Sequence, residues 1–185
     1  MYAVRLMQKA DIKEILRVQS ECYLSAKLES EAILKARLRV SPDSAWVAVD
    51  REGVCAYLVA YRSHWGKVTP LDKVFQVPQI PNCLYLHDLA VGCRAIRQGL
   101  GERLVSCATE LALDEDLAFS SLVSVQGSRK FWERMGYCVV EDLSTEATRD
   151  LATYGSAALY MSRTLLSNSS FAHQHPYHPS TLILN

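Results

Sequence analysis

The feature that most constrains the fold is a strand, a glycine turn and a helix that follow one another in the middle of the chain. Residues 83–91 form an apolar run with the length of a buried strand, and Arg97-Gln98-Gly99-Leu100-Gly101 opens a helix that extends to about residue 113. Apolar side chains recur on one face of this helix at Leu100, Leu104, Cys107, Ala108 and Leu111. Residues 122–125 then return as a strand. Because a strand, a helix and a strand in this order connect through a crossover, we predict a parallel β-α-β unit.

Shorter patterns on both sides of this unit complete an α/β (α+β) domain. β-rich runs predict further strands at residues 3–6, 45–49, 54–61, 137–140 and 157–161. Amphipathic runs predict further helices at residues 12–18, 29–40 and 126–136. We expect a polar loop at residues 141–155 and a loosely ordered tail at residues 166–185. The elements give one domain, residues 1–165, with a mixed central sheet of about six to seven strands flanked by about four helices.

The glycine turn has the chemistry of a phosphate-binding site. Glycine lets an oxygen approach the backbone N–H groups closely, and the start of a helix adds a partial positive charge. A glycine pair can also serve only to pack a strand tightly against a helix, so the turn alone leaves both interpretations open. Arg97 lies in the turn, with Arg94 and Arg103 close by in the sequence. These arginines, between a strand and an amphipathic helix, favour a phosphate-bearing cofactor.

Three segments around this turn resemble a known family. LHDLAV, RQGLGERL and SVQGSRKFWERMGY are similar to the fourth strand, the pyrophosphate loop and the later helix of the GNAT acetyltransferases. The order of elements extends the resemblance over roughly residues 1–165, which implies the GNAT fold and acetyl-CoA as co-substrate. By position, the resemblance implies that the pantetheine arm pairs with the backbone of Leu89, Ala90 and Val91. It implies that the pyrophosphate is surrounded by Arg97, Gln98, Gly99, Leu100, Gly101 and Glu102, and that the cofactor is bordered on its other side by Val125, Ser128 and Phe131.

Two positions depart from the family pattern. The first position of the loop, an Arg or Gln in the family, is Ile96 here, with Arg97 beside it. The backbone N–H groups of the loop can still bind the pyrophosphate, because this binding does not depend on the side chain at position 96. The frequent general acid of the family, a tyrosine after the Phe of the later helix, is replaced by Trp132, whose indole cannot donate a proton near neutral pH. This replacement motivates a non-catalytic acyl-CoA-binding domain as an alternative function.

The predicted reaction is direct attack of a primary amine on the thioester in a ternary complex. A base must first remove a proton, because an alkylamine with a pKa of ~10 is protonated in the cell. His87 is the candidate general base, since an imidazole has an ordinary pKa of about 6.5. The LHxLAV run also resembles the arylalkylamine-type acetyltransferases, in which a histidine at this position serves in proton removal. A structural histidine beside Asp88 is the alternative.

Strand alternation refines this prediction. It directs Tyr85, His87 and Leu89 to one face of the strand and Asp88 to the other, unless a bulge intervenes. Tyr160 is a candidate acid for the thiolate, with Tyr137 as a further guess.

The acceptor pocket of this fold is built by the first two helices and the loops around the sheet. Here these are residues 22–29, residues 65–75 and Tyr154, whose apolar and aromatic content favours a small amine with an apolar or aromatic body. A polyamine or an aminoglycoside is an equal alternative, because acidic residues lie nearby at Glu21, Glu29, Asp72 and Asp142. A protein N-terminal or lysine acetyltransferase is a further alternative. It would need an open groove in place of a proline-rich loop, residues 63–82, closing over a small pocket.

Composition narrows the class of partner. The chain has 20 Lys and Arg against 20 Asp and Glu, so we expect no nucleic-acid partner and no membrane partner. The first residues contain no apolar leader, and we expect a cytoplasmic protein with reduced cysteines. His173, His175 and His178 lie in a short tract without carboxylates, so we predict no metal site. Monomer and homodimer both stay open.

Overall fold

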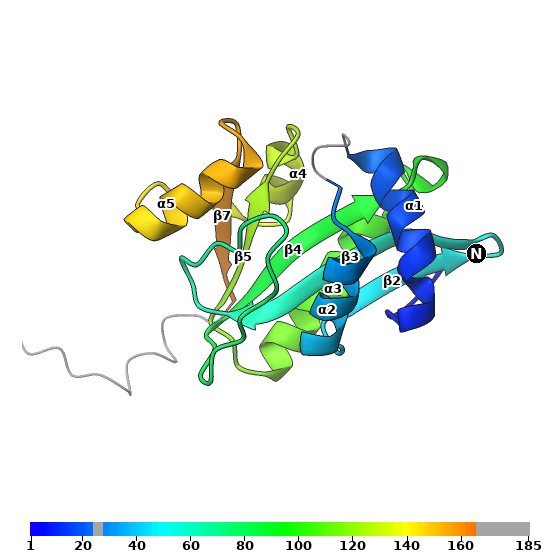
Figure 1. Ribbon diagram of the computed structural model, residues 1–185, viewed down its shortest axis with the longest axis horizontal. Coiled ribbons are helices and arrows are strands. Elements are labelled where there is room, and N and C mark those ends of the chain that lie inside the picture. The colour runs from blue at the N-terminus through cyan, green and yellow to red at the C-terminus, as the bar shows by residue number, and fades with distance from the viewer. Residues whose placement is uncertain (24–27, 166–185) are drawn as a thin grey trace, which may run out of the picture.

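A seven-stranded mixed sheet runs through the computed structural model, which describes residues 1–23 and 28–165 (Figure 1). The strand order is β1-β2-β3-β4-β5-β7-β6. The strands are β1 (Ala3–Leu6), β2 (Ala45–Asp50), β3 (Gly53–Ser63), β4 (Cys83–Val91), β5 (Phe119–Ser124), β6 (Cys138–Val139) and β7 (Leu159–Thr164). Neighbours are antiparallel except β4 and β5, which are parallel. The predicted β-α-β unit is confirmed.

Helices cover both faces of the sheet. They are α1 (Ile12–Cys22), α2 (Glu31–Val40), α3 (Leu100–Asp114), α4 (Arg129–Arg134) and α5 (Thr145–Leu151). One core cluster lies between the sheet and the buried faces of α1, α2 and α5, and it contains Ile15, Leu34 and Ala147. The other cluster, with Leu104 and Trp132, lies on the α3 and α4 side. The mixed architecture with helices on both faces agrees with the predicted fold class.

The segment predicted as a polar loop, residues 141–155, is the main difference from expectation. It contains α5, which begins after Ser144, whose hydroxyl accepts the N–H of Ala147 at 3.1 Å. A serine before Thr-Glu-Ala is a helix-capping signal. The prediction of a loop considered only the polarity of the segment and left this signal out. The tail at residues 166–185 lies outside the described residues.

The position at which α2 starts leaves a carboxylate buried in the protein interior. Ser30 caps the helix by accepting the N–H of Ile33 at 3.3 Å, so Glu29, predicted as the first helical residue, precedes the helix. Its side chain is 5% exposed. The cap thus leaves the start of α2 at the surface, while the carboxylate of Glu29 just before it lies in the protein interior.

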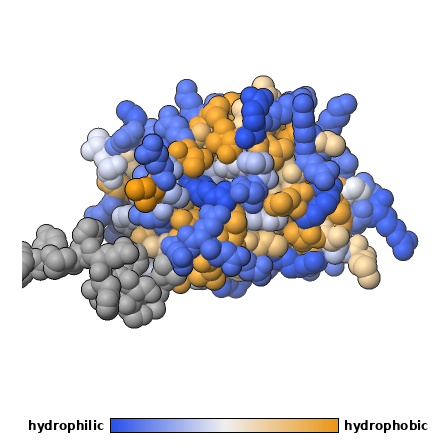
Figure 2. Space-filling view, turned by 90° about the horizontal axis from the view of Figure 1, so that it is seen from below, coloured by the Kyte–Doolittle hydropathy of each residue, from blue (hydrophilic) through white to orange (hydrophobic). Residues whose placement is uncertain are grey.

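The outer surface mixes residue types. On the face drawn in Figure 2, apolar residues form several separate groups among polar ones. No helix within the described ranges is both long enough and apolar enough to cross a membrane.

Candidate active site

The cavity forms where strands β4 and β5 part. β4 pairs with β3 as far as Val91, but it pairs with β5 only over Cys83–Leu86. Beyond Leu86 the two strands diverge in Figure 1, and this edge of β4 has no strand partner in the described part of the chain. A cavity of about 610 Å³ is lined there by residues of both strands. An unpaired strand edge offers N–H and C=O groups to an extended ligand.

The glycine turn forms one end of this cavity. Arg97 and Gly99 have φ angles of 64° and 69°, both in the left-handed region. A non-glycine residue held there costs of order 1 kcal/mol, so the surrounding structure imposes the conformation of Arg97. The turn leads into the start of α3, where backbone N–H groups without helical partners can bind an anion. A Cβ at Gly101 would lie 3.3 Å from the Phe131 ring, so glycine keeps this part of the cavity open.

The predicted cofactor residues gather around the cavity. All of them line it except Ala90: Leu89, Val91, Arg97, Gln98, Gly99, Leu100, Gly101, Glu102, Val125, Ser128 and Phe131. The side chain of Ala90 is 3% exposed and packs in the core on the α1 side instead. Its predicted role concerned the backbone, and that role stays a prediction. The cavity is also lined by residues that were not predicted to contact the cofactor: Ala95, Ile96, Val123, Gln126 and Trp132.

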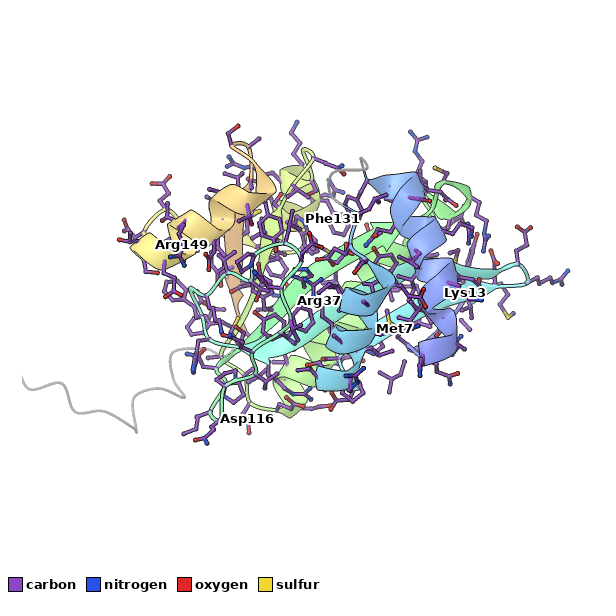
Figure 3. All side chains as sticks on the ribbon, in the orientation of Figure 1. Met7, Lys13, Arg37, Asp116, Phe131 and Arg149 are labelled. Atoms are coloured by element: carbon purple, nitrogen blue, oxygen red, sulfur yellow. The ribbon has the colours of Figure 1, made fainter. Side chains whose placement is uncertain are left out.

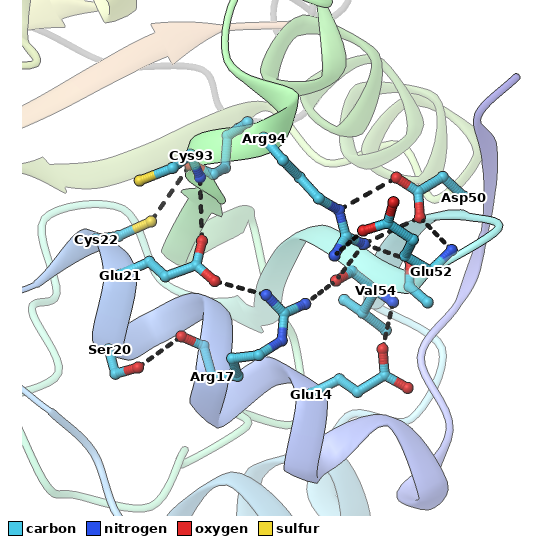
Figure 4. Close-up of polar contacts among 12 residues, drawn as sticks. Glu14, Arg17, Ser20, Glu21, Cys22, Asp50, Glu52, Val54, Cys93 and Arg94 are labelled. Carbon is cyan, nitrogen blue, oxygen red and sulfur yellow. Dashed lines mark hydrogen bonds and ion pairs between the residues drawn. The ribbon is translucent and has the colours of Figure 1, made fainter.

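Of the three arginines that suggested an anion site, only Arg97 lines the cavity. Arg94 forms an ion pair with Asp50 at 3.0 Å on the outside of the domain (Figure 4). Arg103 is exposed on α3. The positive field at the turn therefore comes from Arg97 and the backbone of the helix start.

Polar contacts of α1 fix the segment before the turn. Glu21 accepts the backbone N–H of Cys93 at 3.1 Å and forms an ion pair with Arg17 (Figure 4). Arg17 also donates to the carbonyl of Val54 at 2.7 Å. The helix thus ties the β2–β3 hairpin to the entry of the glycine turn.

A β-bulge in β4 organises the other end of the cavity. Val59 pairs with Asp88 and Ala60 with Leu86, which leaves His87 as the extra residue. A bulge interrupts strand alternation. His87 and Asp88 therefore both face the α1 side, where they meet tyrosines of that core, and Leu89 packs against the core on the α3 side. The predicted alternation, with Leu89 beside His87 and Asp88 opposite, is wrong for this reason.

His87 is held by a buried chain of charges. Its Nε2 lies 3.4 Å from Oε1 of Glu29, and the other oxygen of Glu29 forms an ion pair with Arg37. Arg37 is 1% exposed, donates twice to the carbonyl of Lys73 and lies over the ring of Phe75. In Figure 3 Arg37 points from α2 toward the middle of the molecule, whereas Lys13 and Arg149 lie on the outside of their helices. Burial would raise the pKa of Glu29, but the hydrogen bond and charge of His87 and the charge of Arg37 lower it to about 2.

The contact with Glu29 selects one tautomer of His87. Because an ionised carboxylate only accepts, Nε2 carries a proton, so in the neutral imidazole Nδ1 carries the lone pair. The side chain of His87 is 2% exposed, and Nδ1 has no hydrogen-bond partner in residues 1–23 and 28–165. His87 and Glu29 both line the cavity. Of the four acidic residues considered for the acceptor pocket, Glu29 is the one that lines it.

Asp88 lies between two tyrosines. Tyr23 donates to its Oδ1 and Tyr57 to its Oδ2, each at 2.6 Å. Burial raises the pKa of Asp88, and the two tyrosine hydroxyls lower it in part. Asp88 forms no ion pair with the residues that the structure describes. Asp88 bonds to tyrosines and makes no hydrogen bond to His87 in the described structure, so a structural role of His87 would rest on its contact with Glu29 instead.

The proline-rich loop between β3 and β4 covers this end of the cavity. Phe75 is 4% exposed, stacks on Tyr61 with ring centroids 4.1 Å apart and meets the His87 ring edge-on at 5.2 Å. Tyr154 donates to the carbonyl of Thr69 and so fastens the loop to the segment after α5. The loop closes over His87 rather than leaving a groove above it.

The tyrosines considered as acids do not reach the cavity. Tyr160 is 1% exposed, and its hydroxyl accepts the N–H of Gly66 at 2.8 Å. Burial raises its pKa. Tyr137 is bonded to Ser120 in the core on the other side of the sheet. The structure thus argues against Tyr160 as proton donor, because Tyr160 does not line the cavity, whereas Trp132 does.

Solved structures with the same fold share little sequence with this chain. Ard1 from Thermoplasma volcanium superposes with a TM-score of 0.67 at 16% identity, over 90% of this chain and 99% of that one. The ribosomal-protein-S18-alanine N-acetyltransferase from Escherichia coli gives 0.65 at 14% identity, over 96% and 100%. The GphF GNAT-like decarboxylase in complex with isobutyryl-CoA gives 0.69 at 15% identity, over 89% and 100%. Identities this low show a common fold alone.

Sequence comparison supplies the family. No curated protein sequence matches the chain. A profile described as the acetyltransferase (GNAT) family matches residues 10–137, which run from just before α1 through the glycine turn to just after α4. This match covers more than half of the chain, and the protein belongs to the GNAT acetyltransferase family.

Proposed function

We propose that this protein is an N-acetyltransferase that moves the acetyl group of acetyl-CoA to a small primary amine by direct attack in a ternary complex. The observation that carries the proposal is that one cavity is lined both by the glycine turn at the start of α3 and by a buried histidine, whose Nδ1 has no hydrogen-bond partner among the described residues. The residues suited to hold the cofactor and the candidate base thus line the same cavity. The expected cytoplasmic location and the oligomeric state stay predictions.

The residues of this chain suit acetyl-CoA as co-substrate. The N–H groups of the turn and Arg97 would hold the pyrophosphate, and the free edge of β4 after Leu86 would pair with the pantetheine arm. A neighbour of the same fold was solved in complex with isobutyryl-CoA, which supports an acyl-CoA ligand for this fold. Backbone donors near Leu89 would polarise the thioester carbonyl.

His87 acts as the general base in this proposal. Its Nδ1 takes a proton from the ammonium, the neutral nitrogen attacks the thioester carbon, and the C–S bond breaks with the electron pair leaving on sulfur. Glu29 holds the Nε2 proton and stabilises the imidazolium, as its 3.4 Å distance to Nε2 allows. The contacts with His87 and with Arg37 keep Glu29 ionised. The thiolate needs no dedicated acid, since a thiol with a pKa of about 8.5 is a tolerable leaving group.

The covering loop favours a small acceptor over a polypeptide. Phe75 and the Tyr154–Thr69 bond close the space above His87. Leu71, Tyr23 and Tyr154 give the cavity apolar and aromatic walls. A protein substrate would have to displace this loop.

Binding and turnover test the proposal separately. Calorimetry with acetyl-CoA and with dephospho-CoA measures the cofactor site, and thiol release over a panel of amines measures catalysis. We expect micromolar binding of acetyl-CoA and thiol release with at least one small amine. Binding without release by any amine would support the acyl-CoA-binding alternative that Trp132 motivates. If acetyl-CoA does not bind, acetyl-CoA is not the co-substrate and the proposal is wrong.

A His87→Gln variant tests the base. We expect kcat to fall on the order of 100-fold or more with unchanged acetyl-CoA affinity. The loss should shrink above pH 10, where the amine is already neutral. His64→Gln is the matched control, because His64 is exposed in the loop and does not line the cavity. Equal activity of both variants at pH 7 would exclude His87 as the base.

A further inference from the structure

Two cysteines lie on the two sides of the contact between α1 and the segment before the glycine turn. Cys22 is the last residue of α1, and Cys93 begins the short turn Cys93–Ala95 that follows β4. All six cysteines of the chain are free thiols. Neither Cys22 nor Cys93 lines the cavity, and neither takes part in the proposed transfer.

Hydrogen bonds in both directions hold these two cysteines close together. The thiol of Cys22 donates to the carbonyl of Val91 at 3.3 Å, two residues before Cys93. The backbone N–H of Cys93 donates to Glu21 at 3.1 Å, one residue before Cys22. Figure 4 shows the two sulfur atoms next to each other, between the end of α1 and the turn. The two segments thus face each other through their thiols.

The two thiols differ in exposure and in acidity. Cys93 is exposed, whereas Cys22 is half-buried. Burial raises the pKa of Cys22 to about 11, and among the neighbouring charges that add to this rise Cys93 acts more strongly than the adjacent Glu21. At pH 7 about one in ten thousand Cys22 thiols is therefore ionised. An oxidant from solvent meets Cys93 first, and Cys22 is placed to react with the product.

We propose that Cys22 and Cys93 form a peroxide-sensitive dithiol, which closes to a disulfide and weakens the binding of acetyl-CoA. The reduced cysteines expected from the sequence are the resting form, and hydrogen peroxide is the oxidant. This modification site lies outside the cavity, so it adds a property to the protein that the proposed acetyl transfer does not require.

The oxidation takes two steps. The thiolate of Cys93 attacks one oxygen of hydrogen peroxide, the O–O bond breaks, and the other oxygen leaves as hydroxide, which takes up a proton to give water. Cys93 is then a sulfenic acid. The sulfur of Cys22 attacks the sulfenic sulfur and loses its proton, the S–S bond forms, and the sulfenic oxygen leaves as a second water. The two thiols together lose two electrons and two protons, and one peroxide is reduced to two waters.

The disulfide would act on the cofactor end of the cavity. Bonded sulfur atoms lie about 2.0 Å apart, which is closer than non-bonded atoms approach, so the two segments must move together. The bond also removes the thiol proton that Cys22 donates to the carbonyl of Val91. Val91 and Ala95, on the two sides of Cys93 in the chain, both line the cavity. A movement of the segment between them therefore changes the wall where the pantetheine arm and the pyrophosphate are expected.

Acetyl-CoA should in turn oppose the oxidation. Because binding and oxidation are linked, a ligand that prefers the reduced form stabilises that form by the same factor. A tenfold preference raises the reduction potential of the cysteine pair by about 30 mV. We expect saturating acetyl-CoA to produce a shift of at least this size when the pair is titrated in glutathione buffers.

Mass spectrometry after peroxide treatment and alkylation of the remaining thiols locates the bond. The wild type should carry four alkylated cysteines in place of six. Cys93→Ser should carry five with or without peroxide, whereas the control Cys138→Ser, which removes another exposed thiol, should fall from five to three. Cleavage after lysine and arginine leaves Cys22 in residues 18–27 and Cys93 in residues 74–94, together with Cys83. The bonded pair of peptides should carry its one alkyl group on Cys83.

Calorimetry with acetyl-CoA measures the consequence for the cofactor. We expect the oxidised wild type to bind at least tenfold more weakly than the reduced protein, and a phosphine reductant to restore the affinity. Cys22→Ser keeps a hydroxyl donor for the carbonyl of Val91, and Cys93→Ser keeps Cys22 itself. Both variants should therefore bind acetyl-CoA like the reduced wild type, before and after peroxide.

Six alkylated cysteines after peroxide, or a loss of two that persists in Cys93→Ser, would overturn the dithiol. A disulfide that leaves the affinity for acetyl-CoA unchanged would overturn its effect on the cofactor. Both outcomes leave the proposed function standing. The proposed function fails instead if the reduced protein binds no acetyl-CoA while the disulfide still forms, and the effect on the cofactor then fails with it.

Discussion

Removing the charge of Glu29 tests the buried Arg37–Glu29–His87 chain as a source of stability. The substitution Glu29→Gln keeps the size and shape of the side chain but removes its charge. Arg37, 1% exposed, then has no buried carboxylate in contact, and Nε2 of His87 loses its ionised acceptor. Breaking a buried pair by removing one partner is strongly destabilising, because it leaves an uncompensated charge.

The pKa of Glu29 gives the magnitude. It is lowered from 4.5 to about 2 in the folded protein, and the side chain is 5% exposed. A folded pKa below the unfolded one contributes stability that is present above the unfolded pKa and is lost as the pH falls through the folded pKa. The shift corresponds to about 3 kcal/mol at pH 7, and about 2 kcal/mol of this should persist at pH 3.5.

Urea unfolding at pH 7 and at pH 3.5 measures this contribution. We expect Glu29→Gln to lower the free energy of unfolding by about 3 kcal/mol at pH 7, and by less at pH 3.5. Glu31→Gln is the matched control, because Glu31 is exposed on the same segment and pairs with Lys35 on the helix surface. The Glu31→Gln substitution should leave the free energy of unfolding nearly unchanged at both pH values. If Glu29→Gln is as stable as the wild type at pH 7, or if its deficit does not depend on pH, the buried ion pair does not stabilise the fold as argued.

Two further substitutions test the ends of the site. Gly101→Ala places a Cβ 3.3 Å from the Phe131 ring, so KM for acetyl-CoA should rise while the selectivity between amines stays unchanged. Calorimetry measures the affinity for acetyl-CoA, and thiol release measures the selectivity. An unchanged affinity for acetyl-CoA would contradict the role of Gly101. Tyr160→Phe removes the acceptor of the Gly66 N–H, so the free energy of unfolding should fall by about 1 kcal/mol with nearly unchanged kcat. A large loss of kcat in folded Tyr160→Phe protein would instead restore Tyr160 as the acid.

The cofactor half of the site could be predicted from the sequence because it is local. The glycine turn, the strand before it and the helix after it occupy one continuous segment, and their conformations follow from glycine, apolar periodicity and helix geometry. Most of the predicted residues of this half line the cavity, including Arg97 and Phe131. Arg94 shows the limit of sequence proximity, because its guanidinium turns to Asp50 on a different strand.

The acceptor half depends on contacts between distant segments. Glu29, His87 and Arg37 meet across 58 and 8 residues of sequence separation. Nothing in the local sequence around His87 indicates Glu29 as its partner or the bulge that turns Asp88 to the same face. The engagement of Tyr160 by Gly66, 94 residues away, is likewise a tertiary contact.

The sequence by itself determined the fold class, the family and the position of the cofactor turn, because these follow from short-range periodicity and from residues adjacent in the chain. Only the tertiary structure decided the tautomer of His87, the placement of Asp88 and the closure of the acceptor end by Phe75. The physical reason is that protonation, charge balance and cavity shape depend on which groups pack together within a few ångströms. Sequence spacing does not specify those distances.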